Sequence, residues 1–121
     1  MTNSDLSMMS VDALVEAFEM ACLGQSEALK RLATNSYNKS FRSMMTARDE
    51  LNTRKERPLL ARLYDHADPQ VRYQAALATL AFFPEEARAV IQIVGDDHEW
   101  PSDALARGTL RMLDDGTFVP S

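Results

Sequence analysis

One pattern occurs twice in this chain, and it restricts the fold more than any other feature. Under a shift of 32 positions, a loop motif, a proline and several apolar residues coincide with their counterparts further along the chain. The coinciding pairs are Asp65 and Asp97, His66 and His98, Pro69 and Pro101, Tyr73 and Leu105, and Leu80 and Met112. Units with such a period cannot bury their apolar faces alone, so they stack. Ala76 and Gly108 also coincide, and their small size predicts a close crossing of successive helices.

The helices of the second half have clear start and stop signals. Asp68 is a good N-cap and Pro69 fits the first helical position, so a helix is predicted over residues 70–82. This helix is apolar nearly all round, which makes it the central element of the core. Two further helices are predicted over residues 84–95 and 101–113.

The first half shows apolar residues every three or four positions, as in amphipathic helices. Ser10 as N-cap and Gly24 as C-terminal stop bound a first helix, and residues 25–33 form a short helical segment. Cys22 lies on the apolar stripe, and we interpret it as a small core residue. A long helix is predicted over residues 36–57. Its apolar arc consists of Tyr37, Phe41, Met44, Met45 and Leu51.

Two residues of this long helix need separate interpretation. Arg48 falls on the apolar arc, so either its stem extends to the edge of the arc or a carboxylate of another helix pairs with it. Pro58 ends the long helix and can open a further helical segment that leads to the loop at Asp65.

The composition agrees with an all-α fold of about six helices in a single domain. Aromatic residues make up 7% of the chain and there are four glycines, which disfavours a many-stranded β-fold. We expect a short α–α superhelix over residues 1–121. It divides into a frayed arm (1–9), N-terminal helices (10–57), two repeat units (58–113) and a tail (114–121) whose Phe118 and Val119 fold back onto the body.

The single cysteine and the composition of the first ten residues indicate the cellular compartment. A single cysteine cannot form an intrachain disulfide, and the first ten residues have neither basic residues nor an apolar run. We therefore expect a cytoplasmic protein without a targeting segment.

The net charge of −5 hides a contrast along the chain. Residues 1–29 carry −5, residues 30–62 carry +6 and residues 63–121 carry −6. The negative total charge disfavours a general nucleic-acid binder. The basic middle segment is nevertheless compatible with an acidic partner.

The segment from Leu59 to Leu80 resembles a HEAT-type repeat of the short bacterial variety. The matching order is Asp65, Asp68-Pro69, Val71-Arg72, Ala75-Ala76 and Leu80. The resemblance implies a structural role for Asp65, Asp68, Pro69 and Arg72, with Arg72 paired to Asp68 or Asp65.

The whole chain is similar to a family of small standalone bacterial armadillo/HEAT-like proteins catalogued as a domain of unknown function. The matching residues are Tyr37, Phe41, Met44-Met45, Asp49-Glu50-Leu51, the HEAT-like unit and Ala104-Leu105 with Arg107-Gly108. This similarity implies a fold and transfers no activity.

Motifs of known catalytic sites are missing from the sequence, so we expect neither catalysis nor a cofactor. The two Asp–His loops contain the side chains that metals prefer, but the simpler interpretation is surface capping residues. Several methionines could line a binding groove, although core filling is the usual role of methionine. Trp100 either fills the junction between the repeats or stands exposed as a contact anchor, and of the two we expect burial.

The leading hypothesis is a non-catalytic protein-binding module, an adaptor or an inhibitor of the immunity-protein kind, monomeric or homodimeric. Its contact residues would lie on the long helix, including Tyr37, or on the repeat loops. The candidates are Lys39, Arg42, Arg54, Arg57, His66, His98 and Trp100. Two alternatives remain: nucleic-acid binding through the basic long helix, and a metal-dependent enzyme at the Asp–His loops.

Overall fold

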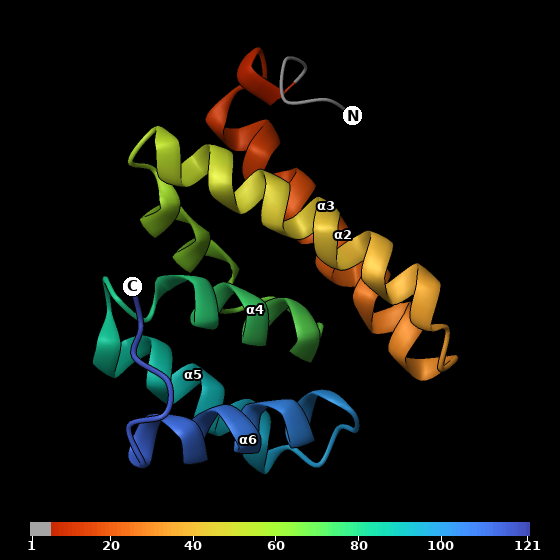
Figure 1. The fold of residues 1–121 in the computed structure, drawn as a ribbon, viewed down its shortest axis with the longest axis vertical. Coiled ribbons are helices and arrows are strands. Elements are labelled where there is room, and N and C mark those ends of the chain that lie inside the picture. Colours follow the sequence, from red (N-terminus) through yellow and green to blue (C-terminus); the bar gives the residue numbers. More distant parts are fainter. Residues whose placement is uncertain (1–5) are drawn as a thin grey trace. The chain divides into compact units, whose positions relative to one another are not determined.

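The computed structural model describes residues 6–121, and this part of the chain consists of helices joined by loops, without a β-strand (Figure 1). The protein is therefore all-α, as predicted. The chain divides into two compact units, Met1–Leu59 and Leu60–Ser121, which are described separately below. Within residues 6–121, none of the helices is long and apolar enough to cross a membrane.

The first unit is a helical hairpin of α2 (Val11–Lys30) and α3 (Thr34–Thr53), which lie side by side (Figure 1). Ser10 caps α2 as predicted, since its hydroxyl accepts a hydrogen bond from the N–H of Ala13 at 3.1 Å. The predicted stop at Gly24 is wrong, because α2 continues through it to Lys30. A Cβ at Gly24 would lie 2.5 Å from the hydroxyl oxygen of Ser40, so this glycine allows the two helices to approach closely.

The interior of the hairpin comes from both helices. Its buried apolar residues include Leu14, Phe18, Cys22, Met44, Ala47 and Leu51. The predicted apolar role of Cys22 is confirmed by its complete burial. Phe41, which was expected on the buried arc, is instead 40% exposed.

The long helix ends earlier than predicted. α3 stops at Thr53, and Lys55 has a φ of 61°, which is incompatible with a continued helix. The 3₁₀ helix η1 (Arg57–Leu63) follows, so Pro58 lies in the first turn of a 3₁₀ helix. The division between the units at residues 59 and 60 falls inside η1.

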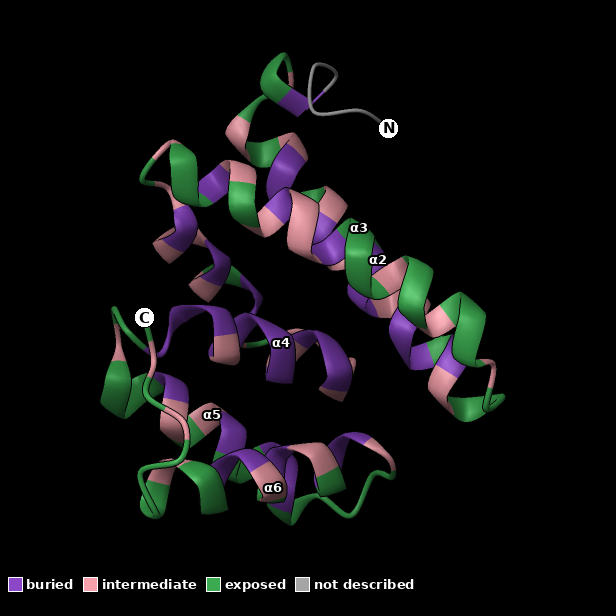
Figure 2. Ribbon diagram, in the orientation of Figure 1, coloured by how far each residue is buried: buried purple, intermediate pink, exposed green. Residues whose placement is uncertain are grey.

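The second unit contains α4 (Pro69–Thr79), α5 (Pro84–Asp96) and α6 (Ser102–Asp114). The predicted start of α4 is confirmed, because the Asp68 carboxylate accepts hydrogen bonds from the N–H groups of Gln70 at 2.9 Å and Val71 at 3.2 Å. The burial of α4 on most sides also agrees with the sequence (Figure 2).

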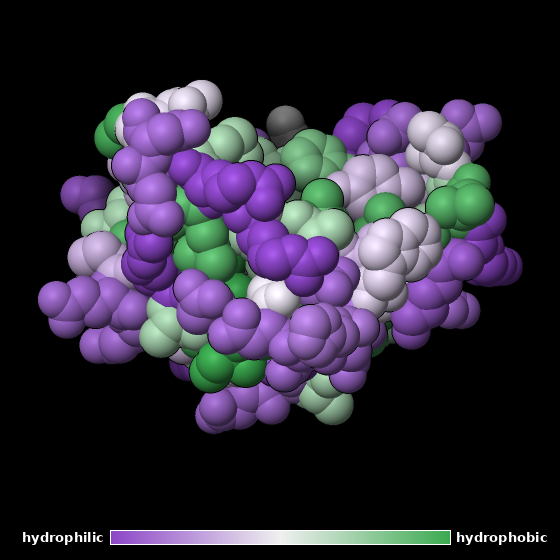
Figure 3. Space-filling view, turned by 90° about the horizontal axis from the view of Figure 1, so that it is seen from below, coloured by the Kyte–Doolittle hydropathy of each residue, from purple (hydrophilic) through white to green (hydrophobic). Residues whose placement is uncertain are grey.

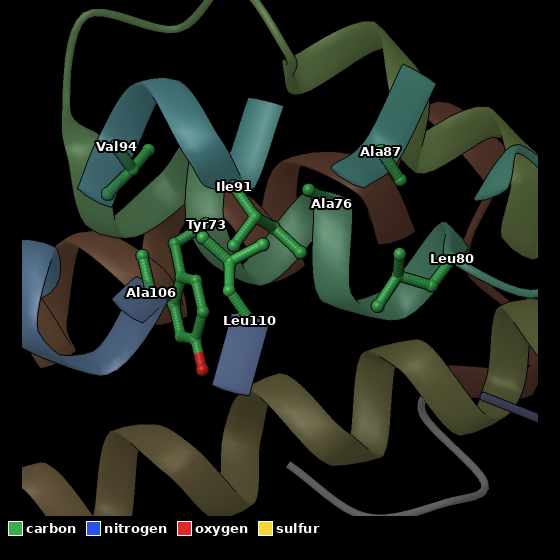
Figure 4. Close-up of a cluster of buried hydrophobic side chains, with 8 residues drawn as sticks. All are labelled: Tyr73, Ala76, Leu80, Ala87, Ile91, Val94, Ala106 and Leu110. Carbon is green, nitrogen blue, oxygen red and sulfur yellow. The ribbon is translucent and has the colours of Figure 1, made fainter. Parts of the chain in front are cut away.

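The core of the second unit lies where α4, α5 and α6 meet (Figure 4). It consists of Tyr73, Ala76, Leu80, Ala87, Ile91, Val94, Ala106 and Leu110. The hydroxyl groups of Tyr73 and Thr109 are hydrogen-bonded at 2.7 Å, which joins α4 to α6 inside this core. Of the two tail residues expected to fold back, Phe118 packs against the core, whereas Val119 is 76% exposed.

The close helix crossing occurs at a different glycine from the one predicted. A Cβ at Gly108 would meet no atom nearer than 3.9 Å, so no neighbouring helix approaches Gly108 closely. A Cβ at Gly95 of α5 would lie 3.3 Å from the Cγ of Arg107 in α6. The helix contact therefore depends on Gly95, which the shift of 32 positions did not single out.

Gly24 and Gly108 make a matched pair for testing the close approach in the hairpin. We expect Gly24→Leu to lower the free energy of unfolding by about 1–3 kcal/mol, because the new side chain must displace α3. Gly108→Leu adds its side chain to a helix surface with space, and leucine has the better helix propensity, so it should leave stability unchanged or slightly raised. Urea unfolding followed by circular dichroism measures both. Equal effects of the two substitutions would contradict the close approach.

Candidate functional site

The loop between α5 and α6, residues 97–101, is fixed to α4 by an ion pair. The Nη2 of Arg72 lies 3.5 Å from the Oδ2 of Asp97. The resemblance to HEAT repeats had implied Asp65 or Asp68 as the partner of Arg72, and that implication is wrong. The carboxylate of Asp68 instead caps α4. Arg72 pairs with Asp97, which coincides with Asp65 under the shift of 32 positions.

A second contact fixes the same loop at its far end. The hydroxyl of Ser102 donates a hydrogen bond of 2.8 Å to the side-chain oxygen of Gln70, and both residues are buried. Gln70 and Ser102 are equivalent under the 32-residue shift, so the first turns of α4 and α6 meet at corresponding positions. The loop is thus held between two side-chain contacts.

Trp100 lies on this fixed loop and is 62% exposed. The expectation that it fills the junction between the repeats is therefore wrong. The first turns of α4 and α6 meet through the polar pair of Gln70 and Ser102, which leaves the apolar indole outside. His98 is also exposed, with a φ of 58°. Figure 3 shows the molecule from below the view of Figure 1, where hydrophilic side chains cover most of the visible surface and a few hydrophobic ones lie between them.

His66, in the loop before α4, has a structural contact. Its Nδ1 accepts a hydrogen bond of 2.9 Å from the N–H of Asp68, which shapes the turn that leads into the cap. Within residues 6–121, no group of three His, Cys, Asp or Glu side chains lies close enough together to hold a metal ion. The geometry of the two Asp–His loops thus gives the metal hypothesis no support.

Arg72 also lines a pocket of about 370 Å³ beside α5, which the sequence did not indicate. The other lining residues are Tyr64, Asp65, Glu86, Ala89, Val90 and Ile93. Burial raises the pKa of Tyr64 above its ordinary value. The Nε of Arg72 is buried and has no hydrogen-bond partner in the part of the chain that the structure describes, so Asp97 is the main restraint on this side chain.

Arg54 was expected on the exposed face of the long helix, and the structure places it elsewhere. Its Nε donates to Glu50 at 2.8 Å, and its two Nη atoms donate to the backbone carbonyls of Leu6, Ser7 and Met9 at 2.7–3.2 Å. Arg54 therefore holds the segment before α2 against the end of α3.

Arg57 was expected on the same exposed face, but it is 5% exposed. Burial lowers its pKa, and the nearby charge of Arg48 lowers it further. The error has one cause for both arginines. The helical wheel assumes a helix through residue 57, whereas α3 ends at Thr53, so the wheel does not apply to Arg54 or Arg57.

Arg48 follows neither of the two interpretations fully. Its side chain is 23% exposed, and its Nη1 lies 3.5 Å from the carboxylate of the adjacent Asp49. The carboxylate thus comes from the same helix, and the contact lies at the edge of the apolar arc.

Lys39 and Arg42 are exposed as predicted, and both line a groove of about 700 Å³ between α2 and α3. The remaining lining residues are mostly small: Leu6, Ala17, Met20, Ala21, Ser36, Ser40, Ser43, Thr46 and Ala47. Met20 is the only methionine among them, so the groove as described is lined by small side chains and does not form the methionine-rich surface considered above.

Comparisons with known proteins give the chain a family. A family model described as "Domain of unknown function (DUF2019)" matches residues 12–114. The crystal structure of the protein RPA1889 from Rhodopseudomonas palustris CGA009 is similar, with 34% sequence identity and a TM-score of 0.91. The match covers 96% of this chain and 98% of that one. Among curated proteins, none matches significantly.

Arg54→Ala tests whether the hydrogen bonds of Arg54 hold the segment before α2 in place. We expect the free energy of unfolding to fall by about 1–3 kcal/mol, because three backbone carbonyls lose a charged donor. Hydrogen exchange of residues 6–10 should accelerate as well. Arg42→Ala, which removes an exposed arginine of α3, should change stability by less than about 0.5 kcal/mol. Unchanged hydrogen exchange of residues 6–10 in Arg54→Ala would show that Arg54 does not hold this segment.

Arg72→Met tests the restraint on the loop of Trp100. Since Trp100 is the only tryptophan of the chain, its fluorescence anisotropy reports the mobility of this loop alone. Loss of the ion pair to Asp97 should lower the anisotropy. Arg88→Met, which removes an exposed ion pair to Asp114 in the same unit, should leave it unchanged. Identical anisotropy in both variants would show that Arg72 does not hold the loop.

Proposed function

Since the chain belongs to the DUF2019 family, a domain of unknown function, we propose a function from its own surface: a non-catalytic module that binds another protein through the α5–α6 loop. Trp100 is the anchor of this contact, and His98 lies beside it. The module acts as an adaptor or as an inhibitor that covers a surface of its partner.

The observation that carries this proposal is an exposed indole on a fixed loop. Trp100 is 62% exposed, while Arg72 and Gln70 hold the loop from both ends. Tryptophan is among the residues that contribute most to binding when a partner covers them. A loop that is already held in place loses little conformational freedom on binding, which favours affinity.

The charge around the loop indicates the chemistry of the partner. Residues 63–121 carry a net charge of −6, and two exposed acids lie directly before the loop and within it, Asp96 and Glu99. A surface of this sign attracts a basic partner surface and repels an acidic one. The proposed partner is therefore a protein with a basic patch around an apolar pocket that accepts an indole.

The HEAT-like interpretation of the second unit forms part of the proposal. It is supported by the pairing of Gln70 with Ser102 and of Arg72 with Asp97, because both contacts join one repeat to the next. A cytoplasmic location also remains a proposal, consistent with the single buried cysteine.

Nucleic-acid binding has weaker support. Arg54 and Arg57, which were expected on the exposed basic face of the long helix, are engaged or buried within the first unit. Lys39 and Arg42 remain exposed on α3, but the loss of Arg54 and Arg57 from this face reduces the phosphate contacts that the helix can make.

Trp100→Ala tests the proposed contact. In affinity capture from the native host followed by quantitative mass spectrometry, we expect the partner to be lost with Trp100→Ala, because removal of an anchoring tryptophan costs about 2 kcal/mol or more of binding. The thermal melt should not change, since the indole is exposed. Met112→Ala is the control, a residue of α6 that is 41% exposed and lies about three turns from the loop.

Two results would contradict the proposal. One is equal capture by both variants, and the other is the absence of any protein enriched by the wild-type chain. With the captured partner in hand, the emission of the single tryptophan gives a direct check, because burial of Trp100 on binding must shift its spectrum to the blue.

A further inference from the structure

We propose that the groove between α2 and α3 is closed by the same groove of a second copy, so that two hairpins form a four-helix bundle. This homodimer is independent of the protein-binding loop, because all of its contacts come from the first unit. The inference rests on the shape of the groove, on one protruding side chain and on the charges along its edges.

The shape suits close packing of helices. Ala17 and Ala21 of α2 and Ser40, Ser43 and Ala47 of α3 line the groove with short side chains. Such residues let a neighbouring helix come near the backbone, as in tightly packed bundles.

A protruding side chain lies at the edge of the same groove. Met20 lines the groove and is 59% exposed, although it is a large apolar residue. A two-fold interface uses one patch on both copies, so the patch must contain both a projection and the hollow that receives it. Met20 is the projection, and the groove beside it is the hollow.

The two edges of the groove carry opposite charges. Glu16 and Glu27 lie on the face of α2 that contains Met20, four residues before it and seven after it. Lys39 and Arg42 lie on the α3 side. All four are exposed.

The register of the hairpin brings these charges together in a dimer. Gly24 faces Ser40, and the helices are antiparallel, so Glu27 is level with Tyr37 and about 3 Å along the axis from Lys39. A two-fold axis parallel to the helices places α2 of one copy over α3 of the other at the same level. Glu27 then meets Lys39 of the second copy, and Met20 enters near Ser43.

The charges also favour a second copy over an unrelated protein. A partner helix of one sign would be attracted by one edge of the groove and repelled by the other. The hairpin itself carries an acidic α2 and a basic α3, so it is complementary to its own two-fold copy.

Analytical ultracentrifugation of the full chain tests the dimer, with Glu27→Lys and Lys39→Glu as separate variants. We expect the wild-type chain to dimerise and each charge reversal to weaken the dimer at least tenfold. The two-fold axis repeats the contact between Glu27 and Lys39, so each substitution alters two ion pairs. An equal mixture of the two variants should form a heterodimer of wild-type strength, since both of its pairs are then opposite in charge. The double variant should also dimerise.

Matched controls separate the groove from a general effect of charge. Glu85→Lys on α5 and Lys55→Glu beyond α3 make the same changes at exposed positions outside the groove and should leave the dimer intact. Circular dichroism verifies that each variant is folded. A wild-type chain that remains monomeric at high concentration overturns the proposal. So does a dimer that tolerates both reversals, or a mixture that fails to restore association. None of these outcomes affects capture by the Trp100 loop, so the two proposals can fail separately.

Discussion

The second unit depends on the burial of α4. This helix has buried residues on most of its circumference, and its Tyr73, Ala76 and Leu80 form one wall of the core that α5 and α6 complete. An apolar helix of this kind is stable only when neighbours cover it, because exposing such a surface to water is unfavourable by about 25 cal/mol for each Å². The positions of α5 and α6 follow from that requirement, and with them the position of the loop that joins these two helices.

The sequence predicts well what is decided locally. Ser10 and Asp68 cap their helices as expected, because an N-cap needs only a short polar side chain and the N–H groups of the next turn. The burial of α4 on most sides was also recognisable, since apolar residues occur around most of its circumference. The family resemblance agrees with the domain of unknown function that the chain matches.

The predictions fail where a residue distant in the sequence determines the local structure. Gly24 has the sequence signature of a helix stop, and only the proximity of Ser40 shows that it serves close packing. Arg54 finds three backbone carbonyls more than forty positions away along the chain, a contact with no sequence signal. Trp100 was misplaced for the same reason, since its burial depended on whether the junction nearby is apolar or, as observed, a polar pair.

The two proposed surfaces differ in charge, and this difference gives them different roles. The groove carries both signs and is complementary to itself, whereas the acidic Trp100 loop is not, because two such loops repel each other. The first surface therefore suits a second copy and the other suits a basic partner. A dimer through α2 and α3 carries two Trp100 loops on one particle. Where a partner offers two matching sites within reach, the second contact becomes intramolecular and strengthens binding without any new residue at the interface. A small module with one anchoring tryptophan per copy would gain most from such pairing.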